Sequence, residues 1–240
     1  MTGVTMGRGA DAVPAIPKKR SWLGVVALLV IVGTQWYAIS TSAPDRDMGN
    51  LQKIMYVHIP SAWMFFIAFF VVALASLMYL WKREERYDLV AASAAEAGAV
   101  FTGMALATGS IWGRPTWGTY WTWDARLTST AVTFLILVGY LALRSAVDDT
   151  ERRARWSAAV GILGALNVPI VYMSVRWWRT LHQVQSSQST VAGPYRTGWQ
   201  LNALAMTLVL IWFIMARYRA ACLERAAESA AENAALGGRA

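Results

Sequence analysis

Apolar residues fall into six long stretches separated by short polar or charged segments. Each has roughly 20 residues, and a helix of that length crosses the roughly 30 Å hydrocarbon layer of a bilayer. Strands are much shorter, and the stretches are rich in Leu, Ala, Val and Phe, so the pattern predicts six transmembrane helices. Their expected ranges are 22–41, 62–81, 89–111, 127–143, 156–175 and 199–216.

The composition supports this pattern. Of the 240 residues, 56% are hydrophobic and only 15% are charged, and the mean hydropathy is +0.37. A soluble domain carries about 25% charged residues, so we expect an all-α polytopic membrane protein rather than a soluble enzyme, a disulfide scaffold or a disordered chain. The single cysteine, Cys222, excludes an intrachain disulfide and a CxxC motif. The sequence has no phosphate-binding GxxxxGK[ST] motif, so the chain is not itself a nucleotide-driven motor.

Lys and Arg predict the orientation. With six spans, fifteen of the 22 basic residues fall on the side of the two termini and seven on the other. The positive-inside rule therefore predicts cytoplasmic termini, and it explains much of the +8 net charge without nucleic acid. We expect a cytoplasmic tail at 1–20, a six-span domain at 21–217 with outer loops at 42–61, 112–126 and 176–198, and a second tail at 218–240. An alternative for the start is a signal peptide cleaved near Ser40, which leaves the other spans unchanged.

Two spans and the second tail carry further expectations. Glu96 is the ionisable residue well inside a span; the simplest interpretation is a protonated side chain bonded to a neighbouring helix, although such residues are also candidates for function. Asn167 and Pro169 predict a kink in the fifth span. The Ala-, Glu- and Arg-rich residues 218–240 have the composition to continue the sixth helix.

Unusual residues gather on the predicted outer side. Both histidines of the chain, His58 and His182, fall there. Between them the loop 112–126 holds four tryptophans: Trp112, Trp117, Trp121 and Trp123. Nine tryptophans lie near the outer side and three near the inner side, whereas an aromatic belt populates both interfaces. The excess indicates an outward-facing aromatic platform.

Two local expectations concern helix ends. Pro60 and Ser61 are suitable residues to begin the second span, directly after His58. If residues 117–124 are helical, Trp117, Trp121 and Asp124 share one face at spacings of four and three.

Two histidines beside aromatic surface fit haem better than zinc. Zinc needs three or four protein ligands, and two histidines with Asp124 make only a weak set. Haem asks the protein for one or two axial ligands, so His58 and His182 can face each other across one iron. Tryptophan faces would cover the macrocycle, and basic residues of the same side would neutralise its propionates: Arg114, Arg126, Arg176 and Arg179.

The segment 112–128 resembles the tryptophan-rich WWD signature of haem-handling proteins in cytochrome c maturation. The histidine segments 57–64 and 174–183 are similar to those of one branch, the haem exporter protein C (CcmC) family. Tyr120 stands where many relatives have Trp. The resemblance extends from the first span to the sixth.

The resemblance implies a six-span inner-membrane protein that presents haem b on the periplasmic side and helps to attach it to the periplasmic haem chaperone CcmE. It implies the ABC transporter CcmAB and the one-span protein CcmD as partners. His58 and His182 would be the axial ligands, with the platform formed by Trp112, Trp117, Trp121, Trp123 and Asp124, and Arg126 would contact haem or the chaperone. We see no general acid or nucleophile dedicated to the attachment, so whether the chain is an enzyme stays open.

Two other classes of function remain. A bis-histidine haem also suits a quinol-linked electron-transfer subunit, but electron transfer across a membrane usually stacks two haems and needs about four histidines. A transporter would use polar residues at mid-membrane or paired broken helices, and only the Asn167/Pro169 kink fits that description.

Overall fold

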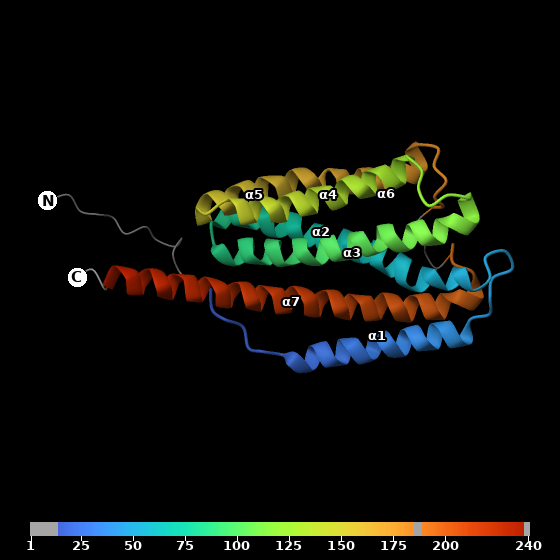
Figure 1. The fold of residues 1–240 in the computed structure, drawn as a ribbon, viewed down its shortest axis with the longest axis horizontal. Coiled ribbons are helices and arrows are strands. Elements are labelled where there is room, and N and C mark those ends of the chain that lie inside the picture. The colour runs from blue at the N-terminus through green and yellow to red at the C-terminus, as the bar shows by residue number, and fades with distance from the viewer. Residues whose placement is uncertain (1–13, 185–188, 238–240) are drawn as a thin grey trace.

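A computed structural model describes residues 14–184 and 189–237, which form an elongated helical bundle (Figure 1). Six segments are long and apolar enough to cross a membrane, which confirms the all-α polytopic prediction. The fifth of these segments comprises two helices. The elements are α1 (Ser21–Thr41), the 3-10 helix η1 (Asn50–Ile54), α2 (Met55–Lys82), α3 (Glu85–Trp117), α4 (Ala125–Ala146), α5 (Thr150–Ala165), α6 (Asn167–Trp177) and α7 (Gly193–Gly237).

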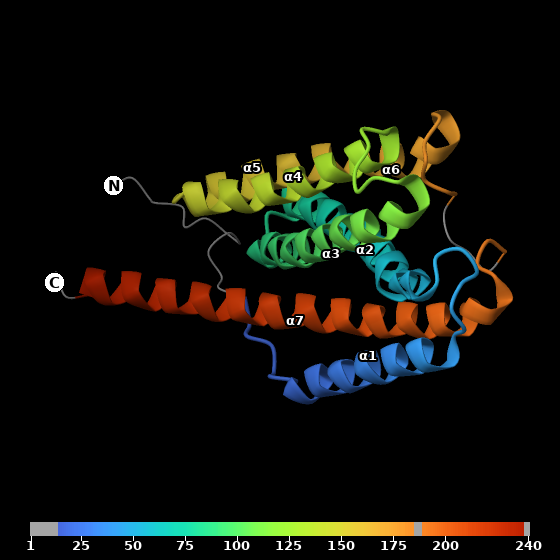
Figure 2. The same ribbon diagram turned by 45° about the vertical axis from the view of Figure 1, so that its right-hand side comes forward.

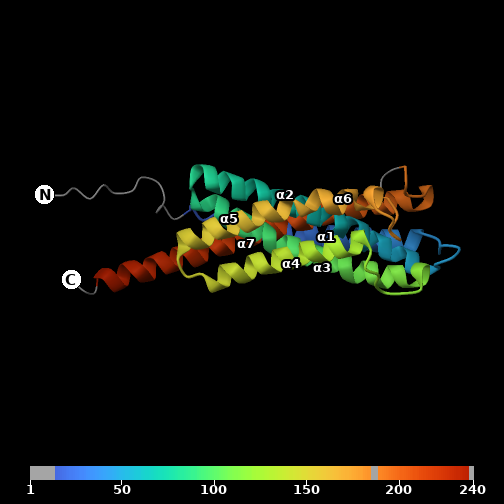
Figure 3. The same cartoon turned by 90° about the horizontal axis from the view of Figure 1, so that it is seen from above.

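The helices run roughly along one axis, as the view from above shows (Figure 3). Helix α7 lies between α1 on one side and the pair α2 and α3 on the other, and α4, α5 and α6 cover the far side of that pair (Figure 1). The core joins α2, α3 and α7 around Phe65, Phe101 and Leu210, and α2, α3 and α4 around Phe69 and Leu137. Three predicted segments lie partly outside the described residues: residues 1–13 of the N-terminal tail, 185–188 of the third outer loop and 238–240 of the second tail.

Helix α2 begins earlier than expected. Its first residue is Met55, so His58 lies in its first turn, and Pro60 lies inside the helix rather than at its start. Pro60 has no N–H to donate to the carbonyl of Tyr56 four residues before it. That carbonyl instead accepts a hydrogen bond from Gln35 Nε2 of α1 at 3.3 Å. The neighbouring helix therefore satisfies the group that the proline releases.

Helix α3 continues beyond its predicted end at residue 111. It includes Pro115 and ends at Trp117, where Gly118 adopts φ +76° as the left-handed cap. Residues 118–124 are not helical, so the conditional helix over 117–124 is wrong, and so is the shared face based on it. Of the predicted loop 112–126, only these seven residues lie outside α3 and α4.

The fifth span breaks at Leu166, which confirms the predicted kink. Pro169 has no N–H for the carbonyl of Ala165, so the helical hydrogen bonding is interrupted there. Asn167 holds the break in place, because its Nδ2 donates to the carbonyl of Ser129 at 2.9 Å and to Thr133 Oγ1 at 2.8 Å. The α6 end of the span is thereby tied to α4.

The sixth span is longer than its apolar core. Helix α7 begins at Gly193, six residues before the expected start, and continues to Gly237. The predicted continuation of this helix into the second tail is thus confirmed. Glu96 is bonded to a neighbouring helix, as expected, and its partner there is Arg217 of α7, with which it forms an ion pair. Farther toward the start of α3, Asp88 accepts two hydrogen bonds from Arg144 of α4, at 2.5 and 2.8 Å.

Candidate functional site

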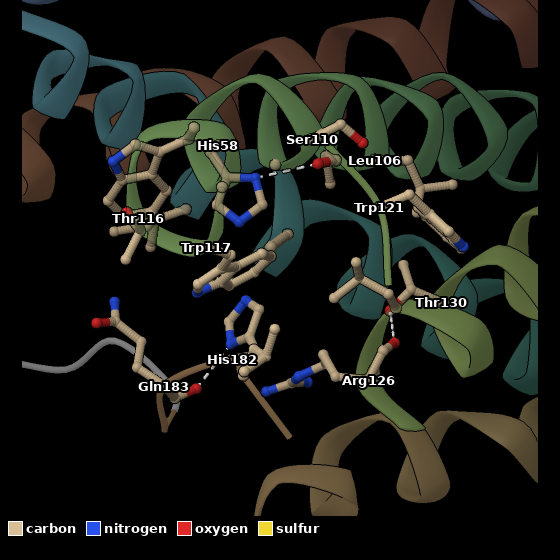
Figure 4. A pocket seen from close by; sticks show the side chains of 18 of the residues that line it. His58, Leu106, Ser110, Thr116, Trp117, Trp121, Arg126, Thr130, His182 and Gln183 are labelled. Atoms are coloured by element: carbon tan, nitrogen blue, oxygen red, sulfur yellow. Dashed lines mark hydrogen bonds between the residues drawn. The ribbon is translucent and has the colours of Figure 1, made fainter. Parts of the chain in front are cut away.

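The two histidines meet at one end of the bundle. His58 extends from the first turn of α2, and His182 lies in the segment that follows α6. Their ring centroids are 6.3 Å apart, although 124 positions separate the residues in sequence. Figure 4 shows the two rings facing the same space, with Trp117 and Arg126 beside them.

Each imidazole is held by its Nδ1 atom. His58 Nδ1 lies 3.0 Å from the carbonyl oxygen of Ala105, and His182 Nδ1 lies 2.7 Å from that of Gln183. A carbonyl only accepts hydrogen bonds, so in both neutral rings Nδ1 carries the proton and Nε2 has a free lone pair. Figure 4 shows both Nε2 atoms directed toward the space between the rings. Metal-binding histidines are typically oriented in this way, by a carbonyl or carboxylate that accepts from the other nitrogen.

Burial keeps His182 in the neutral form. The pKa of His182 is lowered from its usual value, mainly because removal from water disfavours the imidazolium and also because the charge of Arg126 repels it. The bond to the Gln183 carbonyl and the charge of Asp124 oppose this shift only in part. At neutral pH the Nε2 lone pair of His182 is therefore available to a metal.

The separation of the rings fits a single metal between them. A metal–imidazole bond of about 2.0 Å on each side, with roughly 1.15 Å from each nitrogen to its ring centre, places two opposed centroids about 6.3 Å apart. The observed centroid distance is 6.3 Å. The planes are tilted by 41°, and rotation about an axial metal bond accommodates such a tilt. The pair thus has the spacing of two axial ligands on one iron.

A mainly apolar cavity surrounds the two rings. Its walls come from α2, α3, the start of α4 and the segment 181–183. Trp112 and Trp117 line it; Trp112 contacts His58 edge-on at 5.5 Å, and the ring of Trp117 lies 6.3 Å from His182. Trp121 also lines it, and within the described part of the chain its buried Nε1 has no hydrogen-bond partner. Three of the four predicted platform tryptophans therefore face this cavity.

Trp123 lies outside the cavity. Its side chain is 81% exposed and contacts Trp121 edge-on, with ring centroids 5.6 Å apart. Trp177 and Trp178, at the end of α6, are also exposed. The structure thus places these tryptophans on the surface beside the cavity rather than in its wall.

Asp124 does not line the cavity either but organises the peptide around it. Its Oδ1 accepts from Leu127 N at 2.8 Å and caps α4, and its Oδ2 accepts from Leu181 N at 3.1 Å. One carboxylate therefore joins the start of α4 to the residue before His182. We interpret Asp124 as a residue that positions His182.

We expect Asp124→Ala to weaken haem binding about tenfold, because the segment 181–183 loses its link to α4. Loss of the helix cap should also cost about 1 kcal/mol of stability. Asp124→Asn is the matched variant, since its single amide oxygen retains one of the two bonds, and it should lie between wild type and Asp124→Ala. Haem titration followed by absorbance, together with thermal unfolding, measures both effects. Wild-type affinity in Asp124→Ala would show that this link does not position His182.

Arg126 places a cation at the cavity wall. It is buried, with 7% exposure, and its Nη1 donates to the carbonyl of Val171 in α6 at 2.8 Å. Its Nε has no hydrogen-bond partner among the described residues. A buried guanidinium with unused donors is suited to bind a carboxylate. Of the other candidate arginines, Arg114 instead donates to the carbonyl of Gly118 at 2.6 Å.

Sequence reasoning missed Gly109 of α3. A Cβ added there would lie 2.8 Å from His58 Cε1, so only glycine lets the imidazole approach the helix this closely. The only signal in the sequence is a glycine inside a span near the tryptophans. Phe66, Thr130 and Gln183 also line the cavity and were not predicted.

Asp124 does not complete a zinc-binding set with the two histidines. Within residues 14–184 and 189–237, no three His, Cys, Asp or Glu side chains group closely enough to hold a metal ion. Asp124, the third ligand that zinc would need, uses its oxygens for backbone N–H groups.

Comparison with known proteins gives consistent matches. Residues 7–233 match the sequence model of a family described as "Heme exporter protein C". A protein of that name from Bradyrhizobium diazoefficiens is 40% identical over 212 residues, which are 87% of this chain and 80% of the relative. Its namesake from Escherichia coli K12 is 37% identical over 78% of this chain and 80% of the relative. A Marchantia polymorpha protein named "Putative cytochrome c biosynthesis ccmC-like mitochondrial protein" is 36% identical over 65% of this chain and 70% of the relative.

Proposed function

Because the chain belongs to the Heme exporter protein C family, we propose that it binds haem between His58 and His182 and delivers it during cytochrome c maturation. The observation that carries this proposal is the opposed pair of imidazoles. Each has its Nδ1 proton bonded to a backbone carbonyl, and their centroids are separated by the span of one iron. Haem is the cargo of this site, and we propose that it is haem b.

The cavity supplies the other contacts that a porphyrin needs. Trp112, Trp117 and Trp121 offer apolar surface and ring faces to the macrocycle. Arg126 offers a cation for a propionate from inside the wall. The protein thus binds iron, ring and carboxylate with three different kinds of side chain.

We place the site on the periplasmic side of the bacterial inner membrane. The excess of Lys and Arg on the side of the termini supports this orientation. In this proposal residues 1–20 and 218–240 are cytoplasmic, and the membrane domain spans 21–217 with the WWD segment outside. The receiver is the periplasmic haem chaperone CcmE. The ABC transporter CcmAB and the small protein CcmD complete the assembly.

Exposed tryptophans beside the cavity support a docking role. Trp123, Trp177 and Trp178 are all more than half exposed, and large aromatic side chains are frequent anchors at protein interfaces. We assign Trp123 to contact with the chaperone rather than with haem. Its edge contact with Trp121 then joins the docking surface to the cavity wall.

Transfer between purified proteins tests this function. Haem-loaded protein in nanodiscs is mixed with apo-chaperone, and haem is followed by absorbance and by haem stain after separation. We expect haem to move to the chaperone, and Trp123→Ala to slow the transfer about tenfold while keeping the wild-type haem spectrum. Trp36→Ala, which removes a 73% exposed tryptophan of α1, is the matched control and should transfer normally.

The possible outcomes separate the two parts of the proposal. Normal transfer by Trp123→Ala would contradict docking at that side chain. Wild-type protein that binds haem but never releases it to the chaperone would contradict delivery and would favour the electron-transfer alternative.

A further inference from the structure

The broken fifth span creates the side of the cavity that faces the membrane. Helix α5 packs on both α2 and α4, whereas α6 packs on α4 and α5 but makes no extensive contact with α2 in the part of the chain that the structure describes. Figures 1 and 2 show the cause: beyond the break α6 follows α4, while α2 runs toward α7. A straight helix would continue between α2 and α4. Beyond the break at Leu166, the backbone of α6 instead diverges from that of α2 beside the cavity (Figure 1).

Side chains fill the region between the two helices, where Val171 of α6 is buried in one cluster with Phe65 of α2. Phe66 of α2 lines the cavity, and its ring meets that of Tyr172 of α6 edge-on, with centroids 6.1 Å apart. Trp63, one turn earlier on α2, lies 6.2 Å from Phe66 and also lines the cavity. The barrier between α2 and α6 is therefore made of side chains rather than of packed backbone.

The barrier faces apolar surroundings. Phe66 is eleven residues into α2, about 16 Å from its start at 1.5 Å per residue. Exposed apolar side chains lie on neighbouring turns: Phe70, one turn beyond Phe66 on α2, is 67% exposed, and Leu166, at the break before α6, is 66% exposed. At this depth in a membrane-spanning bundle, exposed apolar surface faces lipid. The far side of the barrier is thus the hydrocarbon layer.

The guanidinium of Arg126 lies on the cavity side of the barrier. Arg126 donates to the carbonyl of Val171, the residue before Tyr172. It lines the cavity on the inner side, and its buried Nε has no hydrogen-bond partner among residues 14–184 and 189–237. A carboxylate that passes Tyr172 would meet this guanidinium first.

We infer that Phe66 and Tyr172 form a lateral gate through which haem passes from the outer leaflet of the bilayer into the cavity. The inference rests on the proposed haem-binding function. Haem is a flat apolar ring with two carboxylates, so it partitions into lipid and matches a slot lined with aromatic side chains. Rotation of these aromatic side chains about their torsions opens the slot. Arg126 then binds a propionate as His58 and His182 take the iron.

A bulkier side chain tests the gate without removing any group that binds haem. Tyr172→Trp, at the member of the pair that does not line the cavity, should slow haem uptake from haem-doped phosphatidylcholine vesicles by about tenfold, while the spectrum of the fully loaded protein stays as in wild type. Phe70→Trp enlarges the exposed phenylalanine one turn beyond Phe66 on α2 and is the control. Its uptake should equal that of wild type.

A cross-link tests the gate independently of packing changes. Phe66→Cys combined with Tyr172→Cys allows a short bismaleimide to join α2 and α6, with each single variant treated alike as a control. Cross-linking before haem is added should abolish uptake from vesicles, whereas cross-linking after loading should leave the bound haem spectrum unchanged.

Uptake and spectrum together distinguish a wrong gate from a wrong haem-binding site. Unchanged uptake in both Tyr172→Trp and the cross-linked protein, with a normal bis-histidine spectrum, would overturn the lateral route and leave haem binding intact. Loss of the bis-histidine spectrum in untreated wild type would contradict the site itself.

Discussion

His58→Ala is expected to convert bound haem from a six-coordinate low-spin form to a five-coordinate high-spin form. We expect haem affinity to fall by about 100-fold, the upper range for disturbed metal ligation, because one iron–nitrogen bond is lost. His182→Ala should give the same change, since the two rings stand on opposite sides of one space. Absorption spectra of the oxidised and reduced protein, with haem titration, measure both effects.

Two controls make this result specific. Gln183→Ala removes a neighbouring side chain but keeps the backbone carbonyl that accepts from His182 Nδ1, so it should retain the low-spin spectrum. Free imidazole should restore the six-coordinate form in either histidine variant by filling the space left by the ring. If both single variants keep the wild-type spectrum, the ligand assignment is wrong.

Gly109→Ala should weaken haem binding by about 10- to 100-fold although it changes no ligand. The added Cβ would lie 2.8 Å from His58 Cε1 and 3.2 Å from its Nδ1, so the ring must move away from the Ala105 carbonyl. Alanine is the better helix former by about 1 kcal/mol, so a weaker helix cannot be the cause of the loss. Haem titration and the spin state of the iron report the displacement.

Gly139→Ala of α4 is the control for this substitution, because an added Cβ there has no atom within 4 Å among the described residues. We expect Gly139→Ala to bind haem as wild type does. Equal affinity for Gly109→Ala and wild type would show that the close approach of His58 to α3 is not needed for binding.

Length and hydropathy were enough to predict the bundle, because a membrane-spanning helix must satisfy its own backbone and present apolar side chains over a fixed distance. The kink was predictable as well, since Pro169 cannot donate to Ala165. The ends of the helices were not. Helix α2 continues back over Pro60, and the Tyr56 carbonyl that the proline leaves free accepts a hydrogen bond from Gln35 of another helix. No local pattern in the sequence reveals such a partner.

The site was predictable in its residue types but not in their roles. The aromatic excess and the two histidines on one side indicate a haem site, and the structure brings His58 and His182 together. The irregular path of residues 118–124 determines two of these roles. It lets Asp124 bind the peptide N–H before His182, and it turns Trp123 outward. The importance of Gly109 depends on which ring faces it, which only the packing of α2 on α3 determines.

The most direct test of the site is near-infrared magnetic circular dichroism of the oxidised, haem-loaded wild-type protein, because this spectrum identifies both axial ligands at once. Ligation by His58 and His182 predicts the charge-transfer band of a low-spin iron with two neutral imidazoles. A high-spin spectrum, or a band that reports one imidazole and a different second ligand, would contradict it.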